Sequence, residues 1–152
     1  MAAKHPVRPV EVTADIDAPA DVVFAFVSDT RNDPLWCDNV ETVEMLAGDR
    51  IEVGARFRFH QHLDRPGGQR LQFDVDVEIV GLGDHVITWL ATDRFQEREI
   101  TLRVEPVGQG SRITQVTRAS FHRPPGLARW VYPRLARRIF ARQFRSLAAR
   151  FG

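Results

Sequence analysis

Five segments in the middle of the chain alternate apolar and polar residues with a period of two, the pattern of half-buried strands. Short stretches of turn formers, such as "DRPGGQ", "GLGDH" and "PVGQG", separate them. Because short connections favour antiparallel neighbours, the pattern predicts one continuous antiparallel meander. The alternating segments are residues 55–63, 71–80, 86–92, 96–105 and 112–121.

The residues before the meander predict a strand followed by a short helix. Val10–Ile16 alternates like a strand, and Pro19 suits a first helical position in "DAPADVVFAFVSD". The next segment, "TRNDPLWCDN", allows one further helical turn at most because of its proline. The apolar stripe of the first helix comprises Val22, Val23, Phe26 and Val27.

The end of the chain predicts a long amphipathic helix over Leu127–Phe151, with a kink at Pro133. Seven arginines and no acidic residue lie in this stretch, and the arginines fall largely on the side opposite the apolar residues. The apolar residues that recur at spacings of three and four are Leu127, Val131, Leu135, Ile139, Phe140, Phe144, Leu147 and Phe151.

Charge is distributed unevenly. The first 105 residues hold all 20 acids and 11 of the 21 lysines and arginines, and ten arginines follow Glu105. Such asymmetry can mark a surface for acidic partners. The net charge of only +1 and the absence of a known reading motif argue against nucleic acid.

Composition and length fit one soluble globular domain over residues 1–152. Cys37 is the single cysteine, so no intrachain disulfide can form, and the chain begins without the apolar core of a signal peptide. We therefore expect a cytoplasmic protein.

The first hairpin of the meander determines which side chains share a face. If "RPGGQ" pairs Leu63 with Leu71, then His60 lies opposite Asp74 on a solvated face. Arg58 then faces Asp76, and Arg56 faces Glu78. A metal between His60, His62 and Asp74 is conceivable because both imidazoles lie on one side of a strand. An exposed charge ladder is the favoured interpretation, and no metal site is predicted.

When the register of the first hairpin is extended to the next strands, Trp89 falls on the inner, apolar face of the sheet. A two-residue turn at Asp93 and Arg94 puts Arg98 inside as well, opposite Trp89. An arginine in a solid core is strongly unfavourable, so the pattern predicts a ligand cavity, unless one turn is longer by a residue and Arg98 lies outside. The polar residues of this inner face are Gln61, Gln96, Arg98, Gln115 and Thr117.

The joint order of "DAPADVVFAFVSD", "LWCDNVETVEML", "VGARF" and "GSRIT" resembles the START-like (SRPBCC) superfamily, in particular its polyketide cyclase/dehydrase and lipid transport branch. The resemblance covers Val10 to Phe151. It implies an α+β helix-grip fold of the Bet v type, in which a curved antiparallel sheet surrounds a long C-terminal helix and encloses a cavity.

We expect the cavity to bind a ligand through residues of the inner sheet face, the terminal helix and the "NDPLW" segment, although packing is the favoured role of Trp36. In this interpretation Leu127 also belongs to the helix wall. The candidate ligand-binding residues are Trp36, Phe57, Phe59, Gln61, Phe73, Val75, Val77, Trp89, Gln96, Arg98, Ile100, Gln115, Thr117, Val131, Leu135 and Ile139.

Three functions remain open from the sequence. The favoured one is binding or carrying a lipid- or polyketide-like hydrophobic molecule. The second is a cyclase, aromatase or dehydratase in which Arg98 stabilises an enolate. The predicted inner face offers no His, Asp or Glu as a general base. The remaining candidates for the base are water, Tyr132 and, if the register is shifted, Glu97. The third is docking of the arginine-rich helix on an anionic membrane or an acidic partner. No catalytic residue and no cofactor are assigned, and the oligomeric state stays open.

Overall fold

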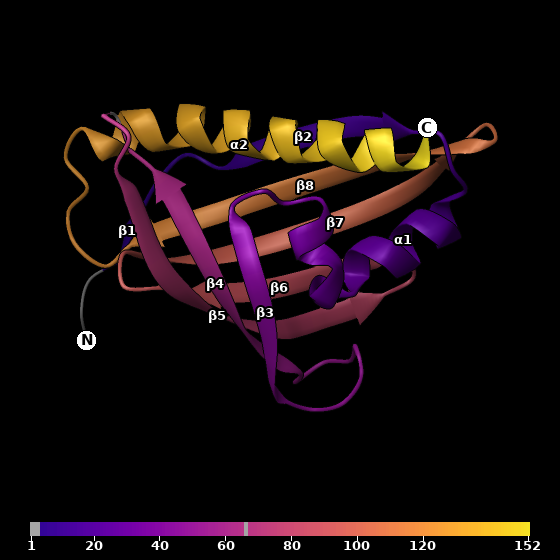
Figure 1. The fold of residues 1–152 in the computed structure, drawn as a ribbon, viewed down its shortest axis with the longest axis horizontal. Helices are drawn as coiled ribbons and strands as arrows, with labels where there is room; N and C mark the ends of the chain where they lie inside the picture. Colours follow the sequence, from indigo (N-terminus) through magenta and orange to yellow (C-terminus); the bar gives the residue numbers. More distant parts are fainter. Residues whose placement is uncertain (1–3, 66) are drawn as a thin grey trace.

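The computed structural model describes residues 4–65 and 67–152, and it has the predicted α+β helix-grip fold. A curved antiparallel sheet wraps around one long helix, α2, while the short helix α1 and the 3-10 helix η1 lie beside it (Figure 1). The elements are β1 (His5–Pro6), β2 (Val10–Ile16), α1 (Ala20–Ser28), η1 (Thr30–Leu35), β3 (Val40–Ala47), β4 (Arg56–Asp64), β5 (Arg70–Gly83), β6 (Val86–Thr92), β7 (Gln96–Val107), β8 (Gly110–Phe121) and α2 (Ala128–Phe151).

The sheet is the predicted meander. Its order is β1-β8-β7-β6-β5-β4-β3, and β2 also pairs with β8. Strands β1 and β2 therefore follow one another along one edge of β8, and the chain crosses from β2 to the far edge at β3 through α1 and η1. A register shift between Ile79 and Gly81 adds a residue to β5, and such bulges bend a strand.

Two of the predicted hairpin registers are confirmed. Leu63 pairs with Leu71 and His60 with Asp74 in β4 and β5. Ile100 pairs with Thr117 in β7 and β8. The side-chain faces derived from these pairs are correct, with Phe59 and Val75 buried.

The register between β6 and β7 was predicted wrongly by two residues. Arg98 lies opposite Ala91, and Trp89 lies opposite Ile100. The turn is longer than expected because the Asp93 carboxylate accepts hydrogen bonds from the backbone N–H groups of Phe95 (2.7 Å) and Gln96 (3.0 Å). Since a slip of two residues preserves the face, Arg98 still points inward.

The predicted apolar face of α2 is confirmed at Phe144 and Leu147 and wrong at its start. Val131 is 58% exposed and Leu127, just before the helix, is 83% exposed, so neither forms the helix wall. The later residues of the predicted series, among them Phe144 and Leu147, face the sheet. The buried or half-buried residues of this inner face are Tyr132, Ala136, Ile139, Phe140, Gln143, Phe144, Leu147, Ala148 and Phe151.

The core is solid at the end where α1 and the second half of α2 meet the sheet. Val23 and Val27 of α1 are fully buried there, whereas Val22 of the predicted stripe is half exposed. Phe144 stacks against Trp36, with ring centroids 6.2 Å apart, and ties α2 to the residue that follows η1. No helix among the described residues has the length and apolar character needed to cross a bilayer.

Replacing Phe144 by alanine tests the helix phase. We expect Phe144→Ala to lower the free energy of unfolding by about 3–5 kcal/mol, because the ring is buried against the sheet. Val131→Ala, on the exposed side of the same helix, serves as the control and should change it by less than about 0.5 kcal/mol. Urea unfolding measures both, and equal effects of the two substitutions would contradict the phase.

Candidate functional site

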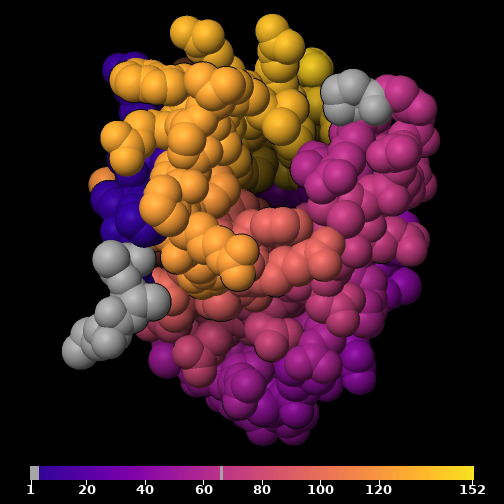
Figure 2. Space-filling model, turned by 90° about the vertical axis from the view of Figure 1, so that its left-hand side faces the viewer, coloured from indigo at the N-terminus to yellow at the C-terminus, as the bar shows by residue number. Residues whose placement is uncertain are grey.

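Two neighbouring chambers lie between the solid core and the opposite end of the molecule. The outer chamber, of about 240 Å³, lies between the first half of α2, the tips of β4 and β5, and the turn from β6 to β7. Figure 2 shows the surface hollowed where these segments meet. The inner chamber, of about 90 Å³, lies deeper, against η1. Both chambers are lined by Asn39, Gln61, Arg98 and Phe140.

Most of the candidate residues line one chamber or both. Gln61 and Arg98 contribute to each. Phe73, Gln96, Leu135 and Ile139 line the outer chamber. The inner chamber is lined by Trp36, Phe59, Val75, Val77, Trp89, Ile100 and Gln115.

Three candidates line neither chamber. Phe57 is completely buried and packs into the solid core. Thr117 is buried beside Gln115, whose side-chain amide donates to the Thr117 hydroxyl at 3.4 Å. Val131 faces away from the cavity, as its exposure requires.

Arg98 is the central polar residue of the cavity. Its side chain is 12% exposed, and its Nη2 lies 3.8 Å from Oδ2 of Asp93, which is 1% exposed. That separation is too long for a hydrogen bond. Within the described residues, Arg98 Nε, Asp93 Oδ2 and Gln96 Oε1 have no hydrogen-bond partner. Three buried polar atoms thus remain unsatisfied in one part of the cavity.

Asp93 corrects the prediction that no acidic residue faces the cavity. It lies directly after β6, where its Oδ1 accepts from the following turn and its backbone oxygen lies 2.8 Å from His122 Nε2. The strand alternation says nothing about a residue in a turn. The signal available in the sequence was an aspartate that begins a turn, a position where its side chain bonds to the backbone two residues on.

Tyr132 of α2 also reaches the outer chamber. Burial raises the pKa of its hydroxyl, and the positive charge of Arg98 and hydrogen bonding from Gln96 partly oppose this change. The ring packs edge-on against Phe121, with centroids 5.4 Å apart. Arg98 therefore has a carboxylate, an amide and a phenol as neighbours.

The inner chamber contains a second acidic residue, Asp33 of η1. Burial raises the pKa of its carboxyl well above the ordinary value; the indole of Trp36 partly opposes this change, and the charge of Asp29 adds to it. Burial likewise raises the pKa of the Cys37 thiol, so the thiol form is favoured.

His60 and His62 pair with separate carboxylates, and His62, predicted to lie outside, also lines the outer chamber. His60 Nδ1 lies 2.6 Å from Asp74 Oδ1, and His62 Nδ1 lies 3.2 Å from Glu41 Oε1. Arg58 donates to Asp76 beside them, at 2.9 Å. Among residues 4–65 and 67–152, no group of three or more His, Cys, Asp or Glu side chains has an arrangement that could hold a metal.

A comparison with protein families gives one match. The model of the family described as polyketide cyclase / dehydrase and lipid transport matches residues 8–152. A search of curated proteins finds no match to the chain.

Several solved structures have the same fold. A START superfamily protein from Mycobacterium smegmatis is 16% identical, with a TM-score of 0.78 over 94% of this chain and 96% of that one. The Zhui aromatase/cyclase from Streptomyces sp. R1128 is 18% identical, with a TM-score of 0.69 and coverages of 94% and 92%. Ginseng major latex-like protein 151 from Panax ginseng is 13% identical, with a TM-score of 0.69 and coverages of 95% and 97%. At such identities the likeness establishes the fold alone.

The raised pKa of Asp33 predicts a pH-dependent stability. Below about pH 4 the carboxyl is protonated in both the folded and the unfolded chain. As the pH rises above that value, the unfolded chain releases this proton first, so the wild type loses stability. We therefore expect Asp33→Asn to gain stability relative to wild type between about pH 4 and pH 7, measured by urea unfolding.

Asp15→Asn is the control of opposite sign. A hydrogen bond from Arg112 lowers the pKa of Asp15, so its carboxylate stabilises the fold above the unfolded pKa and loses this effect as the pH falls. Asp15→Asn should not gain stability as the pH rises. A difference between Asp33→Asn and wild type that is the same at both ends of the pH range would contradict the prediction for Asp33.

Proposed function

This chain belongs to the polyketide cyclase/dehydrase and lipid transport family, and on that premise we propose that it binds a hydrophobic small molecule, lipid- or polyketide-like, in the two chambers. The observation that carries the proposal is the nearly buried Arg98, which lines both chambers and whose Nε has no hydrogen-bond partner among the described residues. The bound molecule would present a carboxylate, enolate or carbonyl to this guanidinium.

The chemistry of the cavity supports such a ligand. Burying a charged group without full hydrogen bonding is costly, and Asp93 at 3.8 Å compensates Arg98 only in part. A ligand oxygen would complete the pairing, because a guanidinium presents several donors in a fixed plane. The remaining walls are largely aromatic and aliphatic, and each Å² of apolar surface they cover contributes roughly 25 cal/mol. The two volumes together reach the lower end of the roughly 300–1,000 Å³ typical of ligand pockets.

A second candidate is an enzyme of the cyclase, aromatase or dehydratase type. The observation that favours it is the group of polar side chains near Arg98, namely Asp93, Gln96 and Tyr132. In this scheme Arg98 would stabilise an enolate, and Asp93 or Tyr132 would exchange a proton with the substrate. Formation of a cyclised or dehydrated product from a poly-β-ketone would separate this function from simple binding.

We also propose that the exposed side of α2 docks on an anionic membrane surface. Four large apolar side chains, Leu127, Trp130, Val131 and Leu135, are exposed around the beginning of α2, and Leu135 lines the outer chamber as well. A bilayer would bury them beside the outer chamber. Aromatic and aliphatic residues interleaved with arginines suit such an interface.

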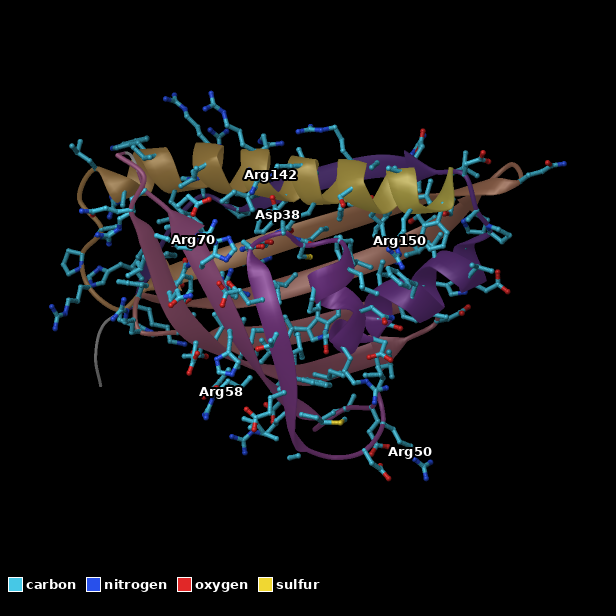
Figure 3. The ribbon with its side chains drawn as sticks, viewed as in Figure 1. Asp38, Arg50, Arg58, Arg70, Arg142 and Arg150 are labelled. Atoms are coloured by element: carbon cyan, nitrogen blue, oxygen red, sulfur yellow. The ribbon has the colours of Figure 1, made fainter. Side chains whose placement is uncertain are left out.

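The arginines of α2 divide into two groups. Arg142 pairs with Asp38 at 3.0 Å, and the two side chains point toward each other in Figure 3. Arg150 lies over the Phe26 ring, and Arg137 donates to the backbone oxygen of Glu11. The second group is exposed and makes no ion pair, side-chain hydrogen bond or aromatic contact among the described residues; its members are Arg129, Arg134, Arg138 and Arg145. This second group supplies the charge complementarity to anionic lipid.

Substitution of Arg98 tests ligand binding. We expect wild type to bind 2-naphthoate, a bicyclic ring bearing one carboxylate, and Arg98→Met to bind it about 10-fold or more weakly, because a hydrogen bond to a charged group contributes roughly 1.5–3 kcal/mol. Isothermal titration calorimetry measures both affinities. Arg118→Met is the control, because Arg118 lies opposite Glu99 on the exposed sheet face. Equal affinities of all three proteins would contradict the role of Arg98.

Vesicle sedimentation tests membrane docking. We expect binding to phosphatidylcholine vesicles that contain phosphatidylglycerol, weakening as salt rises, because the attraction of exposed charges is screened. Trp130→Ala combined with Arg134→Ala and Arg138→Ala should remove most of this binding, whereas Arg103→Ala with Arg118→Ala should not. Equal binding to neutral vesicles at all salt concentrations would contradict the proposal, and so would no binding to either vesicle, which would leave an acidic protein as the partner of this face.

A further inference from the structure

Three polar side chains of the η1 segment fall at positions three residues apart. They belong to Thr30, Asp33 and Trp36, the last being the residue that ends the helix. In a 3-10 helix, side chains three residues apart lie almost directly above one another. The spacing therefore arranges the three in one row, and all three residues line the inner chamber.

Each side chain of this row carries a polar atom without a partner. Within the described residues, Thr30 Oγ1, Asp33 Oδ1 and Trp36 Nε1 are buried and make no hydrogen bond of ordinary geometry, although the Trp36 indole lies close enough to Asp33 to oppose the rise of its pKa. Thr30 and Trp36 are more than nine-tenths buried. Buried polar atoms in folded proteins almost always have a partner, so three unsatisfied atoms in one row need a specific explanation.

The donors and acceptors of the three side chains determine which ligand group could form hydrogen bonds with them. The indole N–H only donates, and the threonine hydroxyl both donates and accepts. Burial raises the pKa of Asp33 and so favours the protonated carboxyl. In this form Asp33, like Thr30, can both donate and accept a hydrogen bond. An anion is disfavoured here, because ionised Asp29 lies close enough to affect Asp33. A neutral hydroxyl, which donates and accepts at one atom, fits such a row.

We propose that Thr30, Asp33 and Trp36 form a subsite for a hydroxyl group, phenolic or alcoholic, on the part of the ligand that enters the inner chamber. This inference rests on the proposed function and extends it, because Arg98 accounts for one polar group of the ligand and the η1 row requires another. The ligand then carries at least two polar groups on an apolar skeleton. One is an oxygen acceptor held by Arg98, and the other is a hydroxyl held by η1.

The test compares 2-naphthoate with its 5-, 6- and 7-hydroxy derivatives. All share the carboxylate for Arg98, and the three isomers place the hydroxyl at different positions on the second ring. We expect at least one isomer to bind wild type about 10-fold more tightly than 2-naphthoate, as two satisfied hydrogen bonds would give. For each protein, calorimetric titration gives the affinity for the hydroxy derivative divided by the affinity for 2-naphthoate. A substitution that weakens the binding of both compounds equally leaves this ratio unchanged.

Two variants and one control keep the readout specific. Asp33→Leu and Thr30→Val replace a polar side chain by an apolar one of similar shape, and each should reduce the ratio to below about 3-fold. Thr30→Val serves alone if Asp33→Leu does not fold. The control is Thr114→Val, since Thr114 bonds to Thr13 on the exposed sheet face and should leave the ratio unchanged.

Each result has a definite meaning. A ratio near one for every isomer in wild type, or a ratio equally large in both variants, would overturn the subsite and indicate that the row binds water only. If 2-naphthoate binds in an Arg98-dependent manner while no isomer binds more tightly, the subsite fails and the proposed function stands. If no naphthoate binds at all, the proposed function fails and the subsite fails with it.

Discussion

The packing of α2 against the concave face of the sheet is the contact on which the rest of the structure depends. A curved sheet has an apolar inner face that another element must cover, and α2 is the element long enough to cover it. Its second half does this with Phe144 and Leu147, which are almost completely buried. The stacking of Phe144 on Trp36 then fixes the end of η1, and thereby one wall of the inner chamber.

The hollow end follows from the side chains that the sheet presents there. Gln61, Arg98 and Gln115 point inward from three different strands, and none of them can be packed against an apolar helix face without a loss of hydrogen bonding. The first half of α2 lines the same chamber as Gln61 and Arg98, and the residues that it contributes there include the small Ala136 and the polar Tyr132. The sequence therefore fills one end of the sheet with apolar packing and leaves space at the other.

The faces of the strands were predictable and the positions of the loops were not. Period-two alternation gave the inward direction of Arg98 even though its strand partner was wrong, because a slip of two residues preserves the face. On α2, the spacing of three and four correctly placed Phe144 and Leu147 inward, but it could not show that the sheet leaves Leu127 and Val131 uncovered. Asp33 and Asp93 escaped prediction because neither lies in a strand, so alternation carried no information about them.

The unsatisfied polar atoms bear more on selectivity than on affinity. A purely apolar molecule would gain from the aromatic walls but would leave Arg98 Nε and the η1 row without partners. A site built to hydrogen-bond its ligand rejects an analogue that lacks the bonding group far more strongly than an apolar pocket rejects a change in size. A simple hydrocarbon chain is therefore a poor match for this cavity. Under the proposals above, an oxygenated ring system would satisfy Arg98 and the η1 row together, because its rigid skeleton would hold two polar groups at a fixed distance with little loss of conformational entropy.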